Sequence, residues 1–397
     1  MTASLDLAGL GADVLLIDKG PFLGGYAANL TCKATDRCLK CNDCLVEEKL
    51  KETSQQASFD IMRGTEAADI KKQGEIFHVS LRSALLWIDP LRCTGCGVCL
   101  DKCPEAARGA ILHAPSHHLS PPYGIDPLKC SCLSSGEKAK CLDLCPEGAI
   151  NLDEKETLKE VDVEAVVLAT GYRPADPAEI GRFKVHRFRN MVTAMELEKM
   201  LRFKGTLLRP SDSASPESLA FIQCVGSRDE QLGHDYCSRV CCGYALRMAS
   251  KLVYDHPDLD IAFFYMDIQN VCSDFDRFIG EARNRIRFIR GLPGDFYASE
   301  KDRVSIGYYD PARRKTLQAD FDIVVLSVGL TPGPSHGFFR DRVGLSLDED
   351  GFLRVPEGAE NQGVFLAGTV EGPMDVSESI SHAKRAVFQV GRYLGLC

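Results

Sequence analysis

The sequence predicts an α/β protein with doubly wound parallel strands, interrupted by a compact cysteine-rich insertion. Short apolar runs rich in Val, Ile and Phe alternate with stretches of helical periodicity along most of the chain. Between residues 89 and 152 this alternation gives way to closely spaced cysteines, prolines and glycines. The 397 residues, 45% of them hydrophobic, suffice for two or three domains with a sizeable core.

The first elements resemble part of a Rossmann unit. A helix is expected over residues 3–11 and a buried strand over Asp13–Asp18, followed by the turn GPFLGG. A complete unit runs strand, GxGxxG, helix, second strand and acidic residue. The helix, the second strand and the acid are present, but the first strand and the glycine loop are not. The sequence therefore begins inside the motif, the missing strand being truncated or supplied from elsewhere; an unrelated α/β start is the alternative.

Strands and helices then follow one another to the end of the chain. Residues 58–88 predict a β-meander, and RPSDSASPES (209–218) predicts a loop. The remaining expected elements are buried strands at 164–171, 218–227, 261–268, 286–291, 321–330 and 363–368, and helices at 238–256 and 376–395.

Sixteen of the eighteen cysteines fall into four groups of four, with Cys272 and Cys397 left over. A [4Fe-4S] cluster takes four thiolates, so the grouping predicts up to four such clusters. A disulfide framework is the alternative, which the CxxC spacings disfavour. The groups are Cys32, Cys38, Cys41 and Cys44; Cys93, Cys96, Cys99 and Cys103; Cys130, Cys132, Cys141 and Cys145; and Cys224, Cys237, Cys241 and Cys242.

The two middle groups form the insertion. CTGCGVCLDKCP is the bacterial ferredoxin run C-x2-C-x2-C-x3-C-P, whose fourth cysteine ligates the neighbouring cluster; zinc is a minor alternative. Lys138 stands where a second C-x2-C would need sulfur, and Cys132 substitutes for it. His117 and His118 lie in a Pro/Ser loop and are interpreted as solvated and not as ligands. Crossed ligation assigns one cluster to Cys93, Cys96, Cys99 and Cys145, and the other to Cys103, Cys130, Cys132 and Cys141.

The two outer groups are less regular. The first has two x2 spacings, which favour a cluster, but no Cys-Pro follows it. The fourth spans Cys224 to the adjacent pair Cys241 and Cys242, and a set of buried free thiols is its alternative.

Charge and hydropathy exclude several classes of protein. The formal net charge of −9 argues against nucleic acid as a partner. No run of 18 apolar residues could span a membrane, and no secretory signal is visible, so a cytoplasmic location is expected.

Several motifs together resemble one family. FIQCVGSRDE (221–230), YCSRVCCGYAL (236–246), VVLSVGLTP (324–332) and FLAGTVEGPMDVSESISHA (365–383) are similar to HdrA, the iron–sulfur flavoprotein component of heterodisulfide reductase. The resemblance covers nearly the whole chain. It implies a thioredoxin-reductase-like fold with two dinucleotide domains and an inserted α+β dicluster ferredoxin domain.

The resemblance also implies a domain organisation. The FAD-binding domain would comprise 1–88, with a cluster segment at 26–50, and return at 153–175 and 332–397. The ferredoxin domain would be 89–152. The second nucleotide-like domain, 176–331, would carry a cluster at Cys224, Cys237, Cys241 and Cys242 instead of NAD, because CVGSR stands where an NAD site needs glycines.

The resemblance assigns FAD to a defined set of residues. Asp18 would take the adenosine ribose, and Gly24 and Gly25 would let the backbone approach the cofactor. Arg247, where many members carry lysine, would lie near the flavin and is the candidate catalytic residue. The other expected cofactor-binding residues are Ala169, Thr170, Gly171, Gly368 and Asp375.

The expected function is electron relay among FAD, the clusters and partner subunits of an anaerobic redox complex, with ferredoxin or a similar carrier. Some members of the family bifurcate electrons at the flavin, which the resemblance leaves open for this chain. Two alternatives remain: an iron–sulfur wire lacking FAD, and a free-standing NAD(P)H-dependent flavin reductase.

Overall fold

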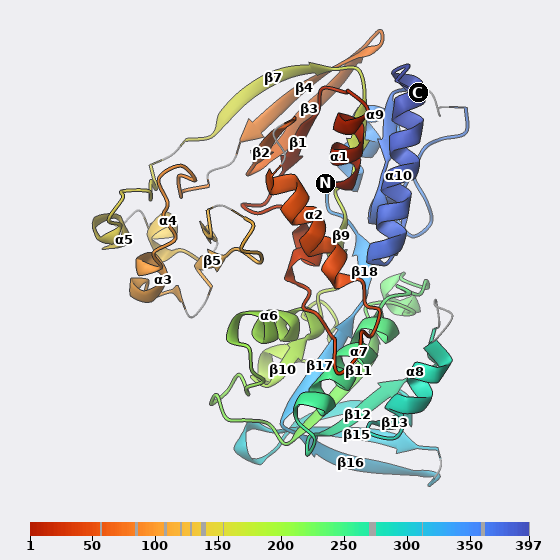
Figure 1. Ribbon diagram of the computed structural model, residues 1–397. Helices are drawn as coiled ribbons and strands as arrows, with labels where there is room; N and C mark the ends of the chain where they lie inside the picture. Colours follow the sequence, from red (N-terminus) through yellow and green to blue (C-terminus); the bar gives the residue numbers. More distant parts are fainter. Residues whose placement is uncertain are drawn as a thin grey trace.

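The computed structural model has an upper part, a lower part and an insertion on one side (Figure 1). Lys138, Cys272 and Cys397 lie outside the residues that it describes. The described residues are 1–55, 58–83, 86–106, 109–119, 121–127, 129–135, 140–153, 155–269, 275–311, 313–358 and 362–396.

The lower part is built on a five-stranded parallel sheet in the order β13-β12-β11-β17-β10. Every residue of the central strand β11 is buried, and its side chains alternate between two cores. Leu219 and Phe221 pack with helix α7, whereas Ala220 and Ile222 pack with the antiparallel sheet β14-β15-β16. The elements are β10 (Met191–Thr193), α6 (Ala194–Lys204), β11 (Ser218–Val225), α7 (Cys241–Asp255), β12 (Asp260–Tyr265), α8 (Phe275–Ala282), β13 (Arg287–Arg290), β14 (Asp295–Ala298), β15 (Val304–Asp310), β16 (Lys315–Phe321) and β17 (Ile323–Val328).

The turn after β11 is closely packed at Gly226. Its φ is +77°, and an added Cβ would lie 2.2 Å from the Cβ of Ala175. Only glycine avoids both the left-handed strain and this overlap.

We therefore expect Gly226→Ala to lower the free energy of unfolding by roughly 2–4 kcal/mol, combining backbone strain with overpacking. Gly233→Ala is the matched control: its φ is +66° and nothing lies within 4 Å of the added Cβ. It should cost only about 1–2 kcal/mol, from the left-handed conformation alone. Denaturant unfolding of the two variants, prepared identically under anaerobic conditions, compares them. Equal losses would contradict the packing argument.

The upper part contains two pairs of parallel strands, β1–β2 and β8–β21, and an antiparallel sheet β3-β4-β7. Helices α1 and α10 pack together over β21, through Leu7, Phe365 and Val387 among others. The elements are α1 (Thr2–Gly9), β1 (Leu15–Asp18), α2 (Asp43–Gln55), β2 (Asp60–Arg63), β3 (Thr65–Gln73), β4 (Ile76–Ser83), β7 (Thr157–Val163), β8 (Val166–Leu168), α9 (His336–Val343), β19 (Ser346–Leu347), β20 (Leu353–Arg354), β21 (Val364–Leu366) and α10 (Val376–Tyr393).

The expected β-meander over residues 58–88 is wrong in one respect. Its first strand, β2, pairs in parallel with β1, from Leu15↔Asp60 to Asp18↔Arg63. The third strand of the meander is β7, which comes after the insertion and pairs with β4. A polar strand such as TLKEVDV, exposed along most of its length, has little hydrophobic signal in the sequence.

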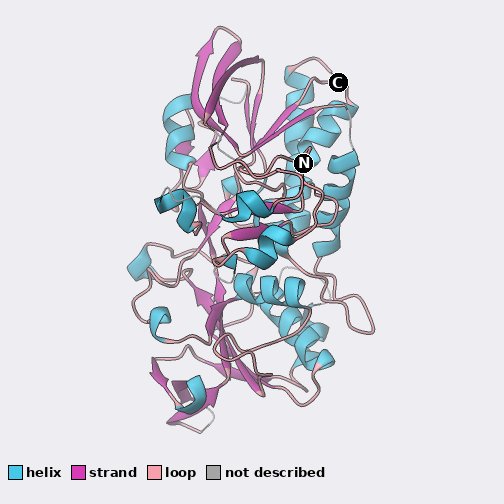
Figure 2. Ribbon diagram, turned by 90° about the vertical axis from the view of Figure 1, so that its left-hand side faces the viewer, coloured by secondary structure: helices cyan, strands magenta, loops and turns pink. Residues whose placement is uncertain are grey.

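The insertion leaves the upper part after β4 and returns at β7. An antiparallel bridge between Ile88 and Ile150 closes its base. Figure 2 views the molecule from the side on which the insertion lies. Its elements are α3 (Val98–Lys102), β5 (Ile111–His113), β6 (Tyr123–Ile125), α4 (Ser131–Ser135) and α5 (Lys140–Leu144).

The insertion is packed against the upper part. Ala114 and Leu119, in the loop that follows β5, join a buried cluster with Leu23, Val46 and Leu50. An apolar contact of this kind fixes the insertion relative to helix α2.

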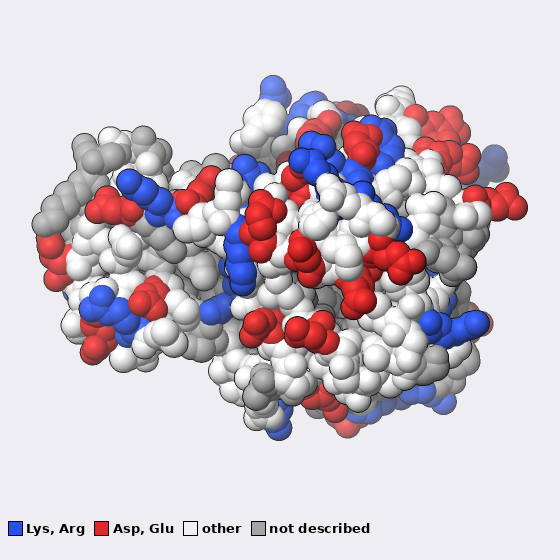
Figure 3. All heavy atoms as spheres, turned by 90° about the horizontal axis from the view of Figure 1, so that it is seen from above, with Lys and Arg blue, Asp and Glu red and all other residues white. Residues whose placement is uncertain are grey.

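Two short strands cross between the upper and lower parts. β9 (Tyr172–Pro174) and β18 (Leu330–Pro332) pair antiparallel and lie between the two parts in Figure 1. Seen from above, acidic and basic side chains are intermixed over the surface (Figure 3). Among the described residues, no helix is both long and apolar enough to cross a membrane.

Candidate functional site

A large cavity lies between the upper part and the N-terminal half of α7. Its volume is about 1730 Å³, which exceeds the roughly 300–1,000 Å³ of ordinary small-molecule sites. Every residue assigned to the cofactor in the sequence lines this one cavity: Asp18, Gly24, Gly25, Ala169, Thr170, Gly171, Arg247, Gly368 and Asp375.

The cavity separates the two strand pairs of the upper part. Its lining includes Leu15–Asp18 of β1 and Val166–Leu168 of β8. Within the described residues, β1 pairs only with β2, and all four residues of β1 line the cavity.

The adenosine end of the predicted site is shaped by Asp18 and Gly24. The Asp18 carboxylate accepts the Gly20 N–H at 2.8 Å, and burial raises the pKa of Asp18. Gly24 has φ +95°, and a Cβ there would lie 2.9 Å from the Cβ of Ala28. The residues at this end fit a nucleotide, because a partly buried acid is followed by a turn in which Gly25 has nothing within 4 Å of an added Cβ, so that a ligand can approach the backbone there.

Asp375 and Gly368 are held by local hydrogen bonds. The Asp375 carboxylate caps α10 by accepting the Glu378 N–H at 2.8 Å, and Glu378 accepts the Asp375 N–H at 3.0 Å. The Gly368 N–H donates to Nδ1 of His382 at 2.8 Å. Asp375 therefore borders the cavity at the start of α10, and Gly368 borders it two residues after the end of β21.

The fourth cysteine group forms at the carboxyl end of β11. Cys224 adopts a left-handed conformation with φ +58°, and Cys241 and Cys242 are the first two residues of α7. Burial, and after it the neighbouring Cys242, raises the pKa of Cys224 to about 12. Burial also raises the pKa of Cys241 well above its usual range, with further contributions from the other three thiols. Four thiols that act on one another in a buried pocket form a donor set suited to a cluster.

One helix joins this group to the cavity. Gly243, Tyr244 and Arg247, in the first two turns of α7, line the cavity directly after Cys241 and Cys242. The Tyr244 hydroxyl donates to the Val328 carbonyl at 3.0 Å, the same carbonyl that the Cys241 thiol approaches at 3.6 Å. The fourth group is thus connected to the cavity lining through the first turn of α7 and through the Val328 carbonyl, which itself belongs to a lining residue.

Arg247 is placed at the cavity but is also tied to the first cysteine segment. Its Nε donates to the Leu39 carbonyl at 2.7 Å, and its guanidinium lies over the rings of Phe275 and Phe278, 5.8 and 5.9 Å from their centroids. These contacts orient a permanent positive charge along the cavity wall.

The tyrosines of this wall are not among the residues that the sequence predicted. Tyr172 lies 5.4 Å from Tyr26, measured between ring centroids, and burial raises the pKa of Tyr172. Tyr244 lies in the motif CCGYAL, and its spacing of three residues from Cys241 on a helix was the available signal.

The insertion brings its eight cysteines into two sets. Cys93, Cys96, Cys99 and Cys145 line one small pocket beside Tyr123. Burial raises the pKa of Cys99 to about 11, and Cys93 and Cys145 make smaller contributions in the same direction. In the second set, burial raises the pKa of Cys141 most. The neighbouring thiols raise it further, namely Cys103, Cys130 and Cys132.

The first cysteine group is more open. Cys32, Cys38 and Cys44 are exposed, and only Cys41 is half-buried. Burial raises the pKa of Cys41, and the next contribution comes from Asp43 instead of another thiol. This segment is joined to the lower part by Lys33, whose buried ammonium pairs with Asp43 and Glu198.

Comparison with known proteins agrees with these observations. Residues 86–108 match the family model of the 4Fe-4S binding domain. Two solved thioredoxin reductases share the fold. The one from T. acidophilum has a TM-score of 0.53 at 14% identity, covering 99% of this chain and 94% of that chain. The one from Lactococcus lactis has a TM-score of 0.54 at 12% identity, covering 100% and 95%.

Curated relatives match almost the entire chain. The HdrA component of the H(2):CoB-CoM heterodisulfide,ferredoxin reductase of Methanothermobacter marburgensis is 31% identical, over 97% of this chain and 60% of the relative. The corresponding iron–sulfur component of the CoB–CoM heterodisulfide reductase of Methanocaldococcus jannaschii is 29% identical, over 98% of this chain and 62% of the relative. This chain thus spans about 60% of the length of these relatives.

The thioredoxin-reductase fold, the ferredoxin-type insertion and the match along nearly the whole sequence lead to one assignment. The chain is HdrA-like: along nearly its whole length it is similar to the A subunit of heterodisulfide reductase.

Proposed function

We propose that this chain is an electron-transfer subunit of an oxidoreductase, with FAD in the central cavity and [4Fe-4S] clusters at the cysteine groups. One observation carries the proposal: helix α7 begins with two cysteines of the fourth group and lines the cavity with its next turn. When bound, FAD exchanges electrons singly or in pairs, and the clusters exchange them singly.

The residues of the cavity have separable tasks in this proposal. Asp18 and the Gly24–Gly25 turn hold the adenosine end, and the ATG turn at 169–171 lines the wall. Arg247 provides a fixed positive charge that favours a reduced, anionic ligand. The CVGSR turn replaces the glycines that would admit NAD in the lower part, so the fourth group occupies that position instead.

Backbone N–H groups tune the cysteine groups. Arg239 N–H donates to Cys237 Sγ, and Ala149 N–H donates to Cys145 Sγ, both at 3.3 Å. Hydrogen bonds to sulfur and burial are the protein's means of setting a cluster's potential. The exposed cysteines of the first group and the partially exposed cysteines of the insertion are the ones accessible to an electron carrier such as ferredoxin, whereas three of the four cysteines of the fourth group are buried. The other proposed partners are further subunits of a heterodisulfide-reductase-like complex.

Metal and flavin content test the proposal. Anaerobically purified protein is expected to contain about sixteen irons per chain, four for each cysteine group, with equal acid-labile sulfide. It should also bind FAD when the cofactor is added to the purified chain, measured by flavin absorbance after gel filtration.

The possible outcomes separate the alternatives. About eight irons per chain, the load of two clusters, would restrict them to the insertion and contradict the outer groups. Stoichiometric zinc in place of iron would contradict electron transfer altogether. Full iron with no flavin uptake would leave an iron–sulfur wire as the better account, and rapid oxidation of NADH by the chain alone would favour a flavin reductase.

A further inference from the structure

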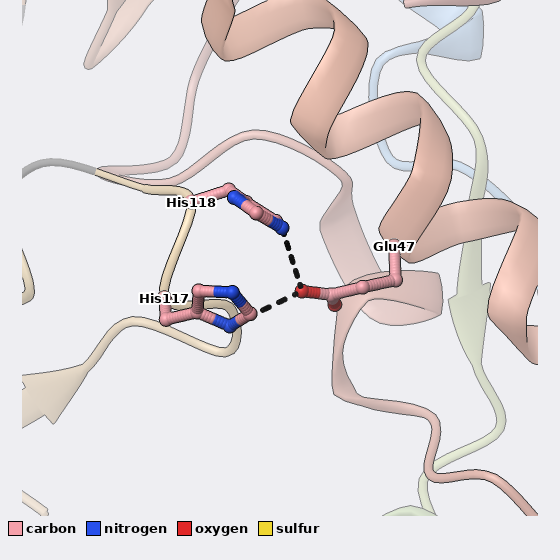
Figure 4. Close-up of side chains that lie close together, drawn as sticks. All are labelled: Glu47, His117 and His118. Atoms are coloured by element: carbon pink, nitrogen blue, oxygen red, sulfur yellow. Dashed lines mark ion pairs between the residues drawn. The ribbon is translucent and has the colours of Figure 1, made fainter.

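Glu47, His117 and His118 form a cluster of metal-binding side chains away from the cysteine groups. Each offers one donor atom, and the three atoms all lie within 4.8 Å of one another. The Glu47 Oε1 atom is 3.7 Å from Nδ1 of His117 and 4.0 Å from Nε2 of His118. Figure 4 shows both imidazoles directed at the same carboxylate oxygen. The sequence interpretation of the two histidines as solvated is therefore wrong for His118, whose side chain is only 22% exposed.

The scaffold around this cluster is fixed. Glu47 lies in α2, and the histidines lie in the insertion loop that Ala114 and Leu119 anchor against Val46 and Leu50. The two imidazole rings lie against each other, with centroids 4.0 Å apart. Two separate parts of the chain thus present their donors across an apolar contact that holds the parts together.

The Glu47 carboxylate is already oriented. Ser116 Oγ donates to Oε1 at 2.6 Å, and Arg202 Nη2 donates to Oε2 at 3.2 Å. A carboxylate has about four acceptor positions, so these bonds leave Oε1 able to bind another group. Such partners fix a metal-ligating carboxylate in place, although the positive charge of Arg202 will lower the affinity for a cation.

We propose that Glu47, His117 and His118 bind one divalent transition-metal ion of the zinc type, with water in the fourth position. Two histidines and one glutamate are a known ligand set for zinc with one open position. Bonds of about 2.0–2.2 Å in tetrahedral geometry place neighbouring donors roughly 3.3 Å apart, so the side chains need move by less than about 1 Å. The ion would link the insertion to α2. Its ligand on that helix, Glu47, is three residues after Cys44.

The test uses protein whose clusters are intact, since empty cysteine groups would bind the metal. Zn²⁺ is titrated calorimetrically, and Co²⁺ is titrated as a spectroscopic probe of the ligand type. One ion is expected per chain, and Co²⁺ should show ligand-field bands without thiolate charge-transfer absorption. His117→Ala, His118→Ala and Glu47→Gln should each weaken binding at least tenfold.

The variants allow a clear decision. His117 is 81% exposed, so its replacement should leave the fold and the iron content unchanged. His78→Ala is the control, because His78 also contacts a carboxylate, Asp162 at 2.6 Å, but is paired with that carboxylate alone in the described contacts. Loss of binding only in the three cluster variants supports the site. Three results overturn it: no saturable binding, thiolate charge-transfer absorption with Co²⁺, or binding by His117→Ala and His118→Ala that is as tight as that of the unaltered chain.

Discussion

Replacing Cys241 with alanine is expected to remove one complete cluster and leave the others in place. Cys241 is buried at the start of α7, where its pKa is raised by burial first and by its three neighbouring thiols next. A cube that loses one of four protein thiolates from a closed pocket has no replacement ligand at hand. The iron content should fall by about four per chain, and one electron paramagnetic resonance signal should disappear from the reduced protein.

Two controls separate ligation from a general disturbance of the site. Cys397→Ser removes a cysteine that stands outside the four groups and should leave every signal unchanged. Ser238→Ala removes a buried hydroxyl that accepts the Leu330 N–H at 2.9 Å, so it should destabilise the region but retain the iron. If Cys241→Ala kept all its iron and all its signals, the fourth group would be a set of buried thiols.

The strands of the central sheet were predicted from their burial. Strands β11, β12 and β17 consist almost entirely of buried residues, most of them apolar, so a short hydrophobic run marked each one. Strand β16 was missed because polar and charged residues fill its exposed positions, and β15 was missed because Ser305 and Gly307 interrupt its apolar residues. The pairing of β2 with β1 could not be read either, because strand order depends on contacts between distant segments.

Some residues of the candidate site could likewise be predicted from the sequence, and others could not. The two cysteine sets of the insertion and the fourth group, which the structure brings together, could be predicted because the number and spacing of the ligands are set by the chemistry of the cluster. The ligand role of these groups, and that of the more open first group, stays a prediction. The cofactor residues followed from the family resemblance, and the structure places them around one cavity. Two contacts were not predicted, because each joins segments that meet only after folding. They are the contact of Glu47 with His117 and the ion pair of Lys33 with Glu198.

Replacing Lys33 with methionine is expected to lower the free energy of unfolding by about 3–5 kcal/mol, the usual cost of breaking a buried ion pair. The Lys33 side chain is 3% exposed, and its Nζ lies 2.8 Å from Asp43 Oδ2 and also contacts Glu198 Oε1. Burial alone would lower the pKa of Lys33, but Glu198 and Asp43 outweigh it and raise that pKa. Below its ordinary pKa of about 10.4, the ammonium therefore contributes its full stabilisation, which is lost only as the pH rises through the raised value.

The loss of stability should come from the two carboxylates that Lys33 leaves behind. Without Lys33, Asp43 and Glu198 are buried carboxylates that have lost their shared cation, and an uncompensated buried charge destabilises the fold strongly. Lys251→Met, which breaks a half-exposed pair with Asp255, should cost under about 1 kcal/mol. Adding Asp43→Asn and Glu198→Gln to Lys33→Met should recover most of the stability, because no uncompensated charge then remains buried. A loss of stability that these substitutions do not rescue would show that Lys33 acts through packing of its aliphatic chain.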